Sequence, residues 1–253
     1  MGLRSRRAVM IMKISIVIPV YNEQESIAPL FQRLKPACQA CRPFEIICID
    51  DGSTDGSLEA LKREQASCPE LKIIHFPSNG GKSAALAAGF KKAQGDIVVT
   101  LDADLQNPPE FIPTLIEKIA DADAVIGWRV DRQDSPARKL ASRFANAVRN
   151  FFLRDGAHDS ACALNAFRRS FLQNFFVFKG MHRFFPALMR MQNARVVEVK
   201  VPHESRRFGR SKYRTFYRGI STFGDLLALI WFKKTKLFDS QEESFGRVGE
   251  DRV

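Results

Sequence analysis

The sequence predicts an α/β protein built around a mostly parallel β-sheet with helices on both faces. Short runs rich in Val and Ile alternate with segments of helical periodicity, and this alternation is typical of β-α-β units. Each run is apolar on both of its faces, as a strand buried between two helical layers must be. The expected strands span residues 13–20, 44–50, 71–76, 96–102 and 122–128, and the expected helices span 24–40, 55–66, 82–94 and 110–120.

The later half of the chain is more basic and less regular. We expect a basic helix at about 136–153, a strand at 164–169, a helix near 182–192, a strand at 195–201 and a basic, Gly-containing loop at 202–212. No internal repeat or low-complexity linker divides the sequence. The simplest organisation is a basic arm over 1–12, one domain over 13–212, an amphipathic helix over 213–235 and a polar tail over 236–253.

The net charge of +11 is concentrated in one block of the sequence. Residues 129–218 hold 20 Lys and Arg against 6 Asp and Glu, whereas the segments on either side are slightly acidic. Such a block predicts an anionic partner met by one face of the molecule, for example nucleic acid, phospholipid or a phosphorylated substrate. A basic face that is merely solvated is the alternative.

Cysteine usage and hydropathy bear on the location of the protein. Five cysteines, an odd number, fit a reduced, cytosolic setting, and Cys38-Gln-Ala-Cys41 lacks the second pair or the histidine that a zinc site needs. No apolar run approaches the roughly 20 residues that cross a bilayer. Because Lys13 interrupts the apolar stretch near the N-terminus, we expect a first buried strand there and not a signal peptide.

Polar motifs follow three of the expected strands, namely Tyr21-Asn22-Glu23, Asp50-Asp51-Gly52-Ser53 and Asp102-Ala103-Asp104. Ligands of open α/β sheets bind beyond the carboxyl ends of the strands, so the three motifs should converge on one rim. Two carboxylates one residue apart repel each other unless a cation lies between them, and hard cations prefer oxygen ligands. The pair therefore predicts either a solvated turn or a divalent metal site, with Gln106 close behind.

A glycine pair opens one of the expected helices. Asn79-Gly80-Gly81-Lys82-Ser83 resembles the end of a P-loop, but Phe76 stands where that motif needs glycine. No G-x-G-x-x-G follows the first strand, which argues against a dinucleotide oxidoreductase. Backbone N–H groups at the glycine pair, with Lys82, can still approach a phosphate. A metal ion at Asp102 and Asp104 would supply the rest of a diphosphate site.

Six motifs together resemble the GT-A glycosyltransferases of the dolichyl-phosphate mannosyltransferase type, in family 2. They are IVIPVYNE (16–23), DDGSTDGS (50–57), N-x-GKSAAL (79–86), LDADLQNPPE (101–110), GMHRFFPAL (180–188) and R-x-x-GRSKY (206–213). The resemblance runs from about residue 13 to 232. It implies a Rossmann-like GT-A fold for the domain and metal-dependent transfer of a sugar, with inversion, from a GDP- or UDP-linked donor to a polyprenyl (dolichyl or undecaprenyl) phosphate.

The resemblance also implies roles for individual residues. Pro19, Tyr21, Asn22, Glu23, Asp51 and Ser53 match the part that holds the nucleoside, and Gly81, Lys82 and Asp102 complete the expected nucleotide site. Asp102, Asp104 and Gln106 match the site for Mg²⁺ or Mn²⁺ and the diphosphate. Arg129, Arg143, Arg206 and Lys212 match basic groups that face the phosphates of donor or acceptor. Asp102, Asp104 and Arg206 are thus the expected catalytic residues.

The chemistry of such a transfer agrees with the composition of the chain. The leaving nucleoside diphosphate develops negative charge that a divalent cation stabilises as a Lewis acid. A phosphate-monoester acceptor is already anionic at neutral pH, so no general base is needed, and the four histidines (75, 158, 182 and 203) include no obvious one. Arginines would offset the repulsion between an anionic nucleophile and an anionic donor.

Two other classes of function remain open at this point. A GT-A enzyme that uses a soluble or glycan hydroxyl would need a catalytic carboxylate on the acceptor side, and the candidates are Asp155, Asp159 and Glu204. A nucleic-acid-binding protein would use the basic block but would leave the acidic pair and the nucleoside motifs unexplained. We therefore expect no nucleic acid partner, and the sequence leaves oligomerisation open.

An apolar stripe near the end of the sequence predicts contact with a membrane surface. Tyr213, Phe216, Tyr217, Ile220, Phe223, Leu227, Ile230 and Trp231 recur at helical spacing. Basic residues flank the stripe at both ends, which suits a helix lying in the headgroup region. We therefore expect a peripheral protein on the cytoplasmic face of a membrane. The alternative is that the stripe packs on the sheet or on a second subunit.

Overall fold

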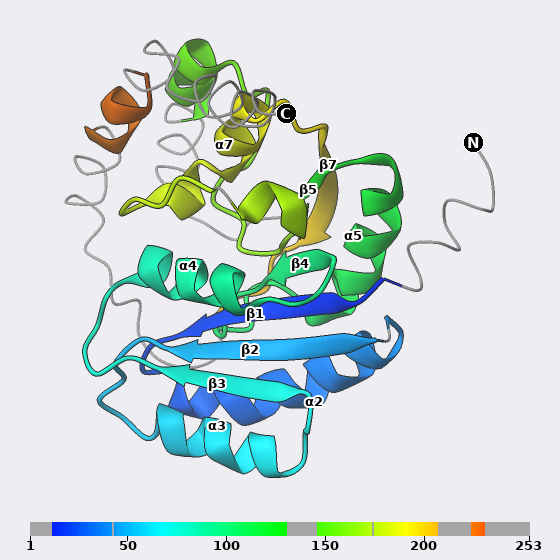
Figure 1. Cartoon of the computed structure of the whole chain (residues 1–253), viewed down its shortest axis with the longest axis vertical. Helices are drawn as coiled ribbons and strands as arrows, with labels where there is room; N and C mark the ends of the chain where they lie inside the picture. Colours follow the sequence, from blue (N-terminus) through cyan, green and yellow to red (C-terminus); the bar gives the residue numbers. More distant parts are fainter. Residues whose placement is uncertain (1–11, 42, 131–145, 174, 207–223, 231–253) are drawn as a thin grey trace, which may run out of the picture.

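The computed structural model describes residues 12–41, 43–130, 146–173, 175–206 and 224–230 (Figure 1). This part of the chain folds around a seven-stranded sheet in the order β3-β2-β1-β4-β6-β5-β7. Strands β1, β2, β3 and β4 run parallel to one another, and β5 pairs with β7 in parallel. Only β6 runs against its neighbours β4 and β5. The predicted mostly parallel α/β sheet is confirmed.

The elements follow the predicted alternation closely in the first half of the chain. The strands are β1 (Ile14–Val20), β2 (Phe44–Asp50), β3 (Leu71–His75), β4 (Ile97–Thr100), β5 (Ala124–Val130), β6 (Asn165–Arg168) and β7 (Val196–Pro202). The helices are α2 (Gln24–Gln39), α3 (Ser57–Ala66), α4 (Lys82–Lys92), α5 (Ile112–Lys118) and α7 (Phe185–Met191), with 3₁₀ turns at Pro109–Phe111, Ile119–Asp121, Arg169–Leu172 and Met181–Arg183. Residues 146–153 and 224–230 are also helical.

Helices cover both faces of the sheet, and each face has its own apolar core. Helices α2, α3 and α5 pack with the alternate strand residues Ile14, Ile16 and Ile18 on one face. Helices α4 and α7 pack with Val17 and Val98 on the other. Because successive residues of a strand point to opposite faces, a strand buried on both sides is expected to be apolar at most positions. Strand β3 departs from that expectation because it lies at the sheet edge, where only Leu71 is buried.

Strand β6 confirms the strand expected at 164–169, but its place in the sheet is the main feature that the alternation did not predict. The strand enters between β4 and β5, so these two consecutive strands are not neighbours. The buried Asn165 begins the strand and links its surroundings: its amide nitrogen donates to Cys162 O at 2.9 Å and Thr100 Oγ1 at 3.3 Å, and its Oδ1 accepts from Gly127 N–H at 3.2 Å. These bonds satisfy a polar side chain that would otherwise destabilise the core.

The expected amphipathic helix is described only at residues 224–230. Leu226 and Leu229 are buried in the core on the α4–α7 face, Ile230 packs against it, and Leu227 is 49% exposed. The described turns therefore pack on the core, as the alternative interpretation expects, with a different set of leucines from the predicted stripe. Six stripe residues lie outside the described residues, namely Tyr213, Phe216, Tyr217, Ile220, Phe223 and Trp231. No helix in the described segments is long and apolar enough to cross a membrane.

A buried carboxylate ties together the amino ends of the central strands. Glu45 on β2 is 2% exposed and accepts hydrogen bonds from Ser15 Oγ, Lys72 Nζ and Gln94 N–H, each at 2.7 Å. Burial by itself raises the pKa of Glu45, but Lys72, Ser15 and the Gln94 N–H together lower the pKa below its ordinary value of 4.5. Its ionised form therefore stabilises the fold above the pKa of the unfolded state.

We predict that Glu45→Gln lowers the free energy of unfolding at pH 7 by about 1–3 kcal/mol, because the charge-assisted bonds are lost. The stabilisation by the Glu45 carboxylate is present above its unfolded pKa and is lost as the pH falls through its lower folded pKa. The difference between the two proteins should thus shrink in acid, as urea unfolding at pH 7 and pH 3 can measure. An equal difference at both pH values would contradict this account.

Candidate active site

The turns that follow β1 and β2 are bonded directly to each other. Asn22 has a positive φ of 52°, its N–H donates to Ser53 Oγ at 2.9 Å, and its Oδ1 accepts from Thr54 N–H at 2.7 Å. Next along the chain, the N–H of Glu23 donates to Ser57 Oγ at 2.8 Å. The first two of the three polar motifs therefore lie together on one rim, with Pro19 and Tyr21 partly exposed beside them.

Asp51 organises the loop that precedes α4. Its carboxylate accepts the N–H of Gly80 at 2.7 Å, the N–H of Gly81 at 3.0 Å and the side-chain amide of Asn79 at 3.0 Å. Burial raises the pKa of Asp51, and the two backbone N–H donors oppose that rise. The sequence suggested that the N–H of Gly81 faces a phosphate; in this structure it donates to Asp51 instead. Gly81 adopts a φ of +86°, which favours glycine.

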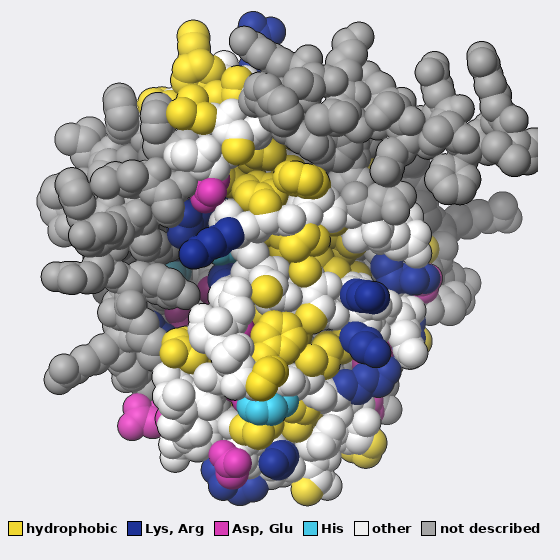
Figure 2. Space-filling model, turned by 60° about the vertical axis from the view of Figure 1, so that its left-hand side comes forward, with side chains coloured by type: hydrophobic (Ala, Val, Ile, Leu, Met, Phe, Trp, Pro, Cys, Tyr) yellow, Lys and Arg dark blue, Asp and Glu magenta, His cyan; other side chains and the backbone are white. Residues whose placement is uncertain are grey.

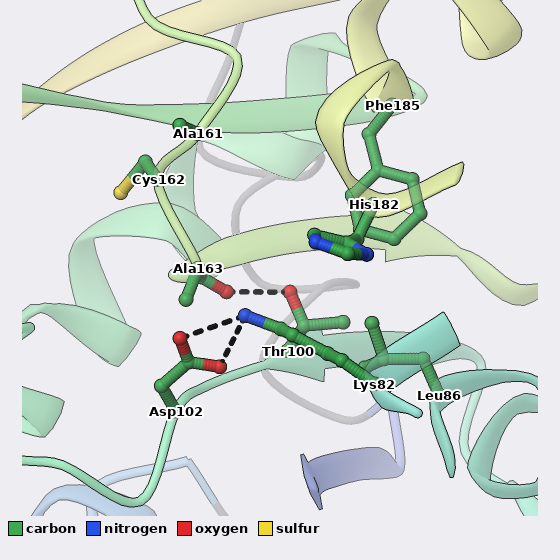
Figure 3. Close-up of a pocket in the computed structure, with 9 residues that line it drawn as sticks. All are labelled: Lys82, Leu86, Thr100, Asp102, Ala161, Cys162, Ala163, His182 and Phe185. Carbon is green, nitrogen blue, oxygen red and sulfur yellow. Dashed lines mark hydrogen bonds and ion pairs between the residues drawn. The ribbon is translucent and has the colours of Figure 1, made fainter. Parts of the chain in front are cut away.

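Lys82 begins α4 and binds the first carboxylate of the acidic pair. Its ammonium lies 2.5 Å from Asp102 Oδ1 and 2.7 Å from Oδ2 (Figure 3). The sequence assigned Lys82 to the nucleotide, but its partner here is the carboxylate that the sequence assigned to a metal. Because Asp51 fixes residues 79–81, it also fixes where α4 starts and hence where this ammonium lies.

The surroundings of the second carboxylate, Asp104, shift its pKa. Burial, followed by the negative charge of Asp102, raises the pKa of Asp104 to about 6, while the Gln106 N–H and the charges of Arg206 and Lys82 oppose the rise. Leu105, between the two residues Asp104 and Gln106, has a positive φ of 61°, which costs about 1–3 kcal/mol for a non-glycine residue. The backbone is therefore strained directly after the acidic pair, where the Gln106 N–H donates to Asp104 Oδ1 at 3.1 Å.

Arg206 reaches the same rim from beyond β7. It forms an ion pair with Glu23, and its charge also acts on Asp104. Arg129, by contrast, is committed to the buried Asp159, with its Nε 2.6 Å from Oδ2 and its Nη2 3.0 Å from Oδ1. Of the other two expected basic residues, Arg143 and Lys212, both lie outside the described residues.

A small pocket adjoins the Lys82–Asp102 pair, between α4, β4 and the segments at 161–163 and 182–185 (Figure 3). It is lined by Lys82, Leu86, Thr100, Asp102, Ala161, Cys162, Ala163, His182 and Phe185. His182 Nδ1 lies 3.1 Å from Ser83 Oγ, which fits the hydrogen-bonding role expected from the sequence. Thr100, Leu86 and the two alanines carried no chemical signal in the sequence, because only the fold brings them to the site.

Each candidate acceptor-side carboxylate is held by an arginine. Asp155 is fully buried and binds Arg149 Nε at 2.8 Å, Asp159 binds Arg129 as described, and Glu204 Oε1 lies 2.7 Å from Arg33 Nη2. In each case the arginine occupies carboxylate oxygens that a general base would turn toward the acceptor. In this arrangement the described residues therefore offer none of the three as an available general base.

Comparison with known proteins agrees with this geometry. Residues 15–176 match the family model described as glycosyl transferase family 2. Undecaprenyl-phosphate 4-deoxy-4-formamido-L-arabinose transferase of Pectobacterium carotovorum is 43% identical to this chain over 224 residues, which cover 87% of the chain and 68% of the relative. The protein of the same name from Salmonella paratyphi B is 40% identical over 87% of the chain and 68% of the relative.

Solved structures show the same fold. Glucosyl-3-phosphoglycerate synthase from Mycobacterium tuberculosis, in complex with phosphoglyceric acid, superimposes with a TM-score of 0.70 at 19% identity, covering 90% of this chain and 82% of that one. A mannosyltransferase from Pyrobaculum calidifontis in complex with GDP-Man and Mn²⁺ gives a TM-score of 0.59 at 22% identity, covering 79% of this chain and 59% of that one.

Proposed function

We propose that this chain, which belongs to glycosyl transferase family 2, transfers 4-deoxy-4-formamido-L-arabinose from a nucleotide-sugar donor to undecaprenyl phosphate. Relatives that are 40–43% identical over 87% of the chain carry this activity in their names. The structural observation that carries the choice of acceptor is the pairing of Asp155, Asp159 and Glu204 with arginines. Among the described residues, these three acceptor-side carboxylates are engaged by arginines, and this arrangement suits a nucleophile that is already anionic.

The nucleoside part of the donor would bind beside the turns that follow β1 and β2. Pro19, Tyr21, Asn22, Glu23 and Ser53 border this place, and Asp51 holds the loop next to it. The diphosphate would then lie toward Lys82 and the acidic pair, and the sugar toward the small pocket that Lys82 shares with His182. Lys82 would exchange some of its contact with Asp102 for a diphosphate oxygen.

The acidic pair fits a divalent cation, Mg²⁺ or Mn²⁺. The negative charge of Asp102 raises the pKa of Asp104 at this partly buried rim, and a cation bound to both carboxylates would relieve the repulsion. Among the described residues no group of three or more His, Cys, Asp or Glu side chains could hold a metal, so Gln106 and donor oxygens would complete the coordination. Such an ion supplies Lewis-acid stabilisation to the departing diphosphate.

In the transfer itself, an oxygen of the acceptor phosphate attacks the anomeric carbon while the bond from that carbon to the donor diphosphate breaks. No proton has to be removed from the nucleophile. Arg206 lies beside both Glu23 and Asp104, so it can receive the acceptor phosphate and offset its repulsion from the donor. Attack from the side opposite the leaving group gives inversion.

The proposal is tested by assaying the purified chain with undecaprenyl phosphate, Mg²⁺ or Mn²⁺, and a panel of donors. The panel should hold the UDP-linked formamido sugar, UDP-glucose and GDP-mannose, and the product is lipid-linked sugar. We expect the formamido donor to give the highest kcat/KM. Transfer only from another donor would change the sugar assignment, and transfer only to a hydroxyl acceptor would overturn the acceptor class.

We predict that Asp104→Asn lowers the rate of transfer about 100-fold or more while leaving the melting temperature nearly unchanged, because the residue lies on a rim and not in the core. The exposed Asp121, on the turn after α5, provides a matched control: Asp121→Asn removes the same charge away from the site. Excess chelator should abolish activity of the wild type. Full activity in chelator would show that no divalent metal takes part.

We also propose that the protein binds the cytoplasmic face of the membrane that holds its acceptor. Hydrophobic side chains gather at the top of the molecule in Figure 2, the end at which Figure 1 draws the helix at 146–153. Phe151 and Phe152 on that helix are 76% and 45% exposed. Arg154 and Arg190 line an open hollow beside them and would meet anionic headgroups. The expected helix at 213–235 would add to this surface, and five free cysteines suit a reducing compartment.

We predict that replacing Phe151 and Phe152 together by Ser weakens binding to anionic liposomes about tenfold or more, since the two aromatic side chains that would insert into the membrane are lost. The matched control replaces both by Leu, which keeps the surface apolar and should bind almost normally. Sedimentation with vesicles measures the affinity, and donor binding should not change. Equal binding by the Ser and Leu variants would exclude these residues from the membrane surface.

A further inference from the structure

One arginine outside the described site binds two glutamates from distant parts of the chain. Arg33 lies in the middle of α2, and its Nε and Nη2 bind the Glu110 carboxylate at 2.7 and 2.9 Å. Its Nη2 and Nη1 also bind the Glu204 carboxylate at 2.7 and 3.1 Å. The two glutamates raise the pKa of the guanidinium, first through the bond to Glu110 and then through that to Glu204. We call these three residues the Arg33 clamp.

The two glutamates belong to the two segments that form the proposed metal and acceptor sites. Glu110 lies in the 3₁₀ turn that directly follows the loop of Asp102, Asp104 and Gln106. Glu204 follows β7, and its N–H also donates to the carbonyl of Gln106 at 2.9 Å. We call residues 102–106 the acidic loop. The segment at 203–206 is attached to this loop through the backbone bond to Gln106, and to the turn that follows the loop through Arg33 and Glu110.

The clamp bears on Arg206, which is only two residues beyond Glu204. Arg206 forms an ion pair with Glu23, and its charge acts on Asp104. Its position therefore depends on the position of Glu204, two residues earlier in the chain. Without Arg33, Glu110 and Glu204 would repel each other across the gap between the two segments. A lysine has a single ammonium and lacks the planar fork that serves two carboxylates at once.

The Arg33 clamp contributes little to the stability of the fold. The side chains of Arg33, Glu110 and Glu204 are 26%, 49% and 27% exposed, and ion pairs in such positions contribute only about 0–1 kcal/mol each to folding. Geometry is a stronger reason, because displacing a group by about 1 Å in an active site can cost a factor of about 100 in rate.

We propose that Arg33 is a positioning residue that holds the segment of Arg206 at a fixed distance from the acidic loop. This proposal rests on the proposed function, in which Arg206 receives the acceptor phosphate. Arg33 itself touches neither substrate. Its loss should therefore lower kcat and weaken use of the acceptor without weakening binding of the donor nucleotide.

The test compares Arg33→Lys with Lys35→Met. Lys35 is on the same helix, is 29% exposed, and pairs with Glu64 on α3 at 2.9 Å, away from the site, so it is a matched ion pair. We expect Arg33→Lys to lower kcat/KM for undecaprenyl phosphate about tenfold or more, with the Kd for the nucleotide unchanged. Lys35→Met should change neither. Equal effects of the two substitutions on transfer would refute the proposal.

Repeating the Arg33→Lys substitution in a variant that lacks the Arg206 side chain separates a positioning role from a general loss of structure. If Arg33 acts through Arg206, then Arg33→Lys should have almost no further effect in a chain that already carries Arg206→Ala. Multiplicative losses in the double variant would show that Arg33 acts independently, and would overturn the proposal. If Arg33→Lys fails to fold, Glu110→Gln removes one arm of the clamp and takes its place in both tests.

Hydrogen exchange keeps the proposal testable even if no sugar transfer is found. The amide of Glu204, which donates to Gln106, should exchange at least tenfold faster in Arg33→Lys than in the wild type or in Lys35→Met. Faster exchange without any transfer activity would reject the proposed function and retain the clamp. Unchanged exchange at Glu204 would reject the clamp whatever the enzyme does.

Discussion

The repulsion between two carboxylates, Asp102 and Asp104, is the constraint on which the rest of the site depends. They stand one residue apart just after the fully buried strand β4, and the backbone directly after them is strained at Leu105. Cations must therefore come to them from elsewhere in the fold. Lys82 comes from the start of α4, where Asp51 fixes the preceding loop, and Arg206 comes from beyond β7. The two earlier polar motifs thus act on the acidic pair indirectly, Asp51 through the loop before Lys82 and Glu23 through Arg206.

The strands of the second half of the fold bring the chain back to the edge of the sheet where Asp102 and Asp104 lie. Strand β6 inserts between β4 and β5, and β7 then runs parallel to β5 so that its carboxyl end points toward the acidic loop. The bond from Glu204 N–H to Gln106 and the Arg33 clamp fasten the returning segment there. The arginines that hold Asp155 and Asp159 fix the loop between residues 154 and 163, which walls the small pocket. Among the described residues of this half, Asp155, Asp159 and Glu204 are each paired with an arginine.

The first half of the fold was predictable because its central strands are apolar at most positions on both faces and its polar motifs stand at strand ends. The insertion of β6 was not, since pairing partners far apart in the chain leave no local pattern. Arg33 shows the same limit: it looks like any exposed helix residue, and its partners Glu110 and Glu204 lie 77 and 171 positions away. At the end of the chain, periodicity included Leu227 in the apolar stripe, whereas packing buries Leu226 and Leu229. Lys82 and Asp102 were both recognised as functional, but the ion pair between them was not predicted.

The central claim is that this site takes an acceptor that is already anionic and therefore needs no general base. The most direct measurement compares undecaprenyl phosphate with undecaprenol, which has the same lipid chain and only a hydroxyl, using one donor and one metal. We expect transfer to the phosphate with a rate that is nearly constant from pH 7 to pH 9, and at least 1,000-fold less transfer to the alcohol, consistent with the typical worth of general-base assistance and charge placement. Comparable transfer to both acceptors would contradict the account, because the site would then have to contain a base.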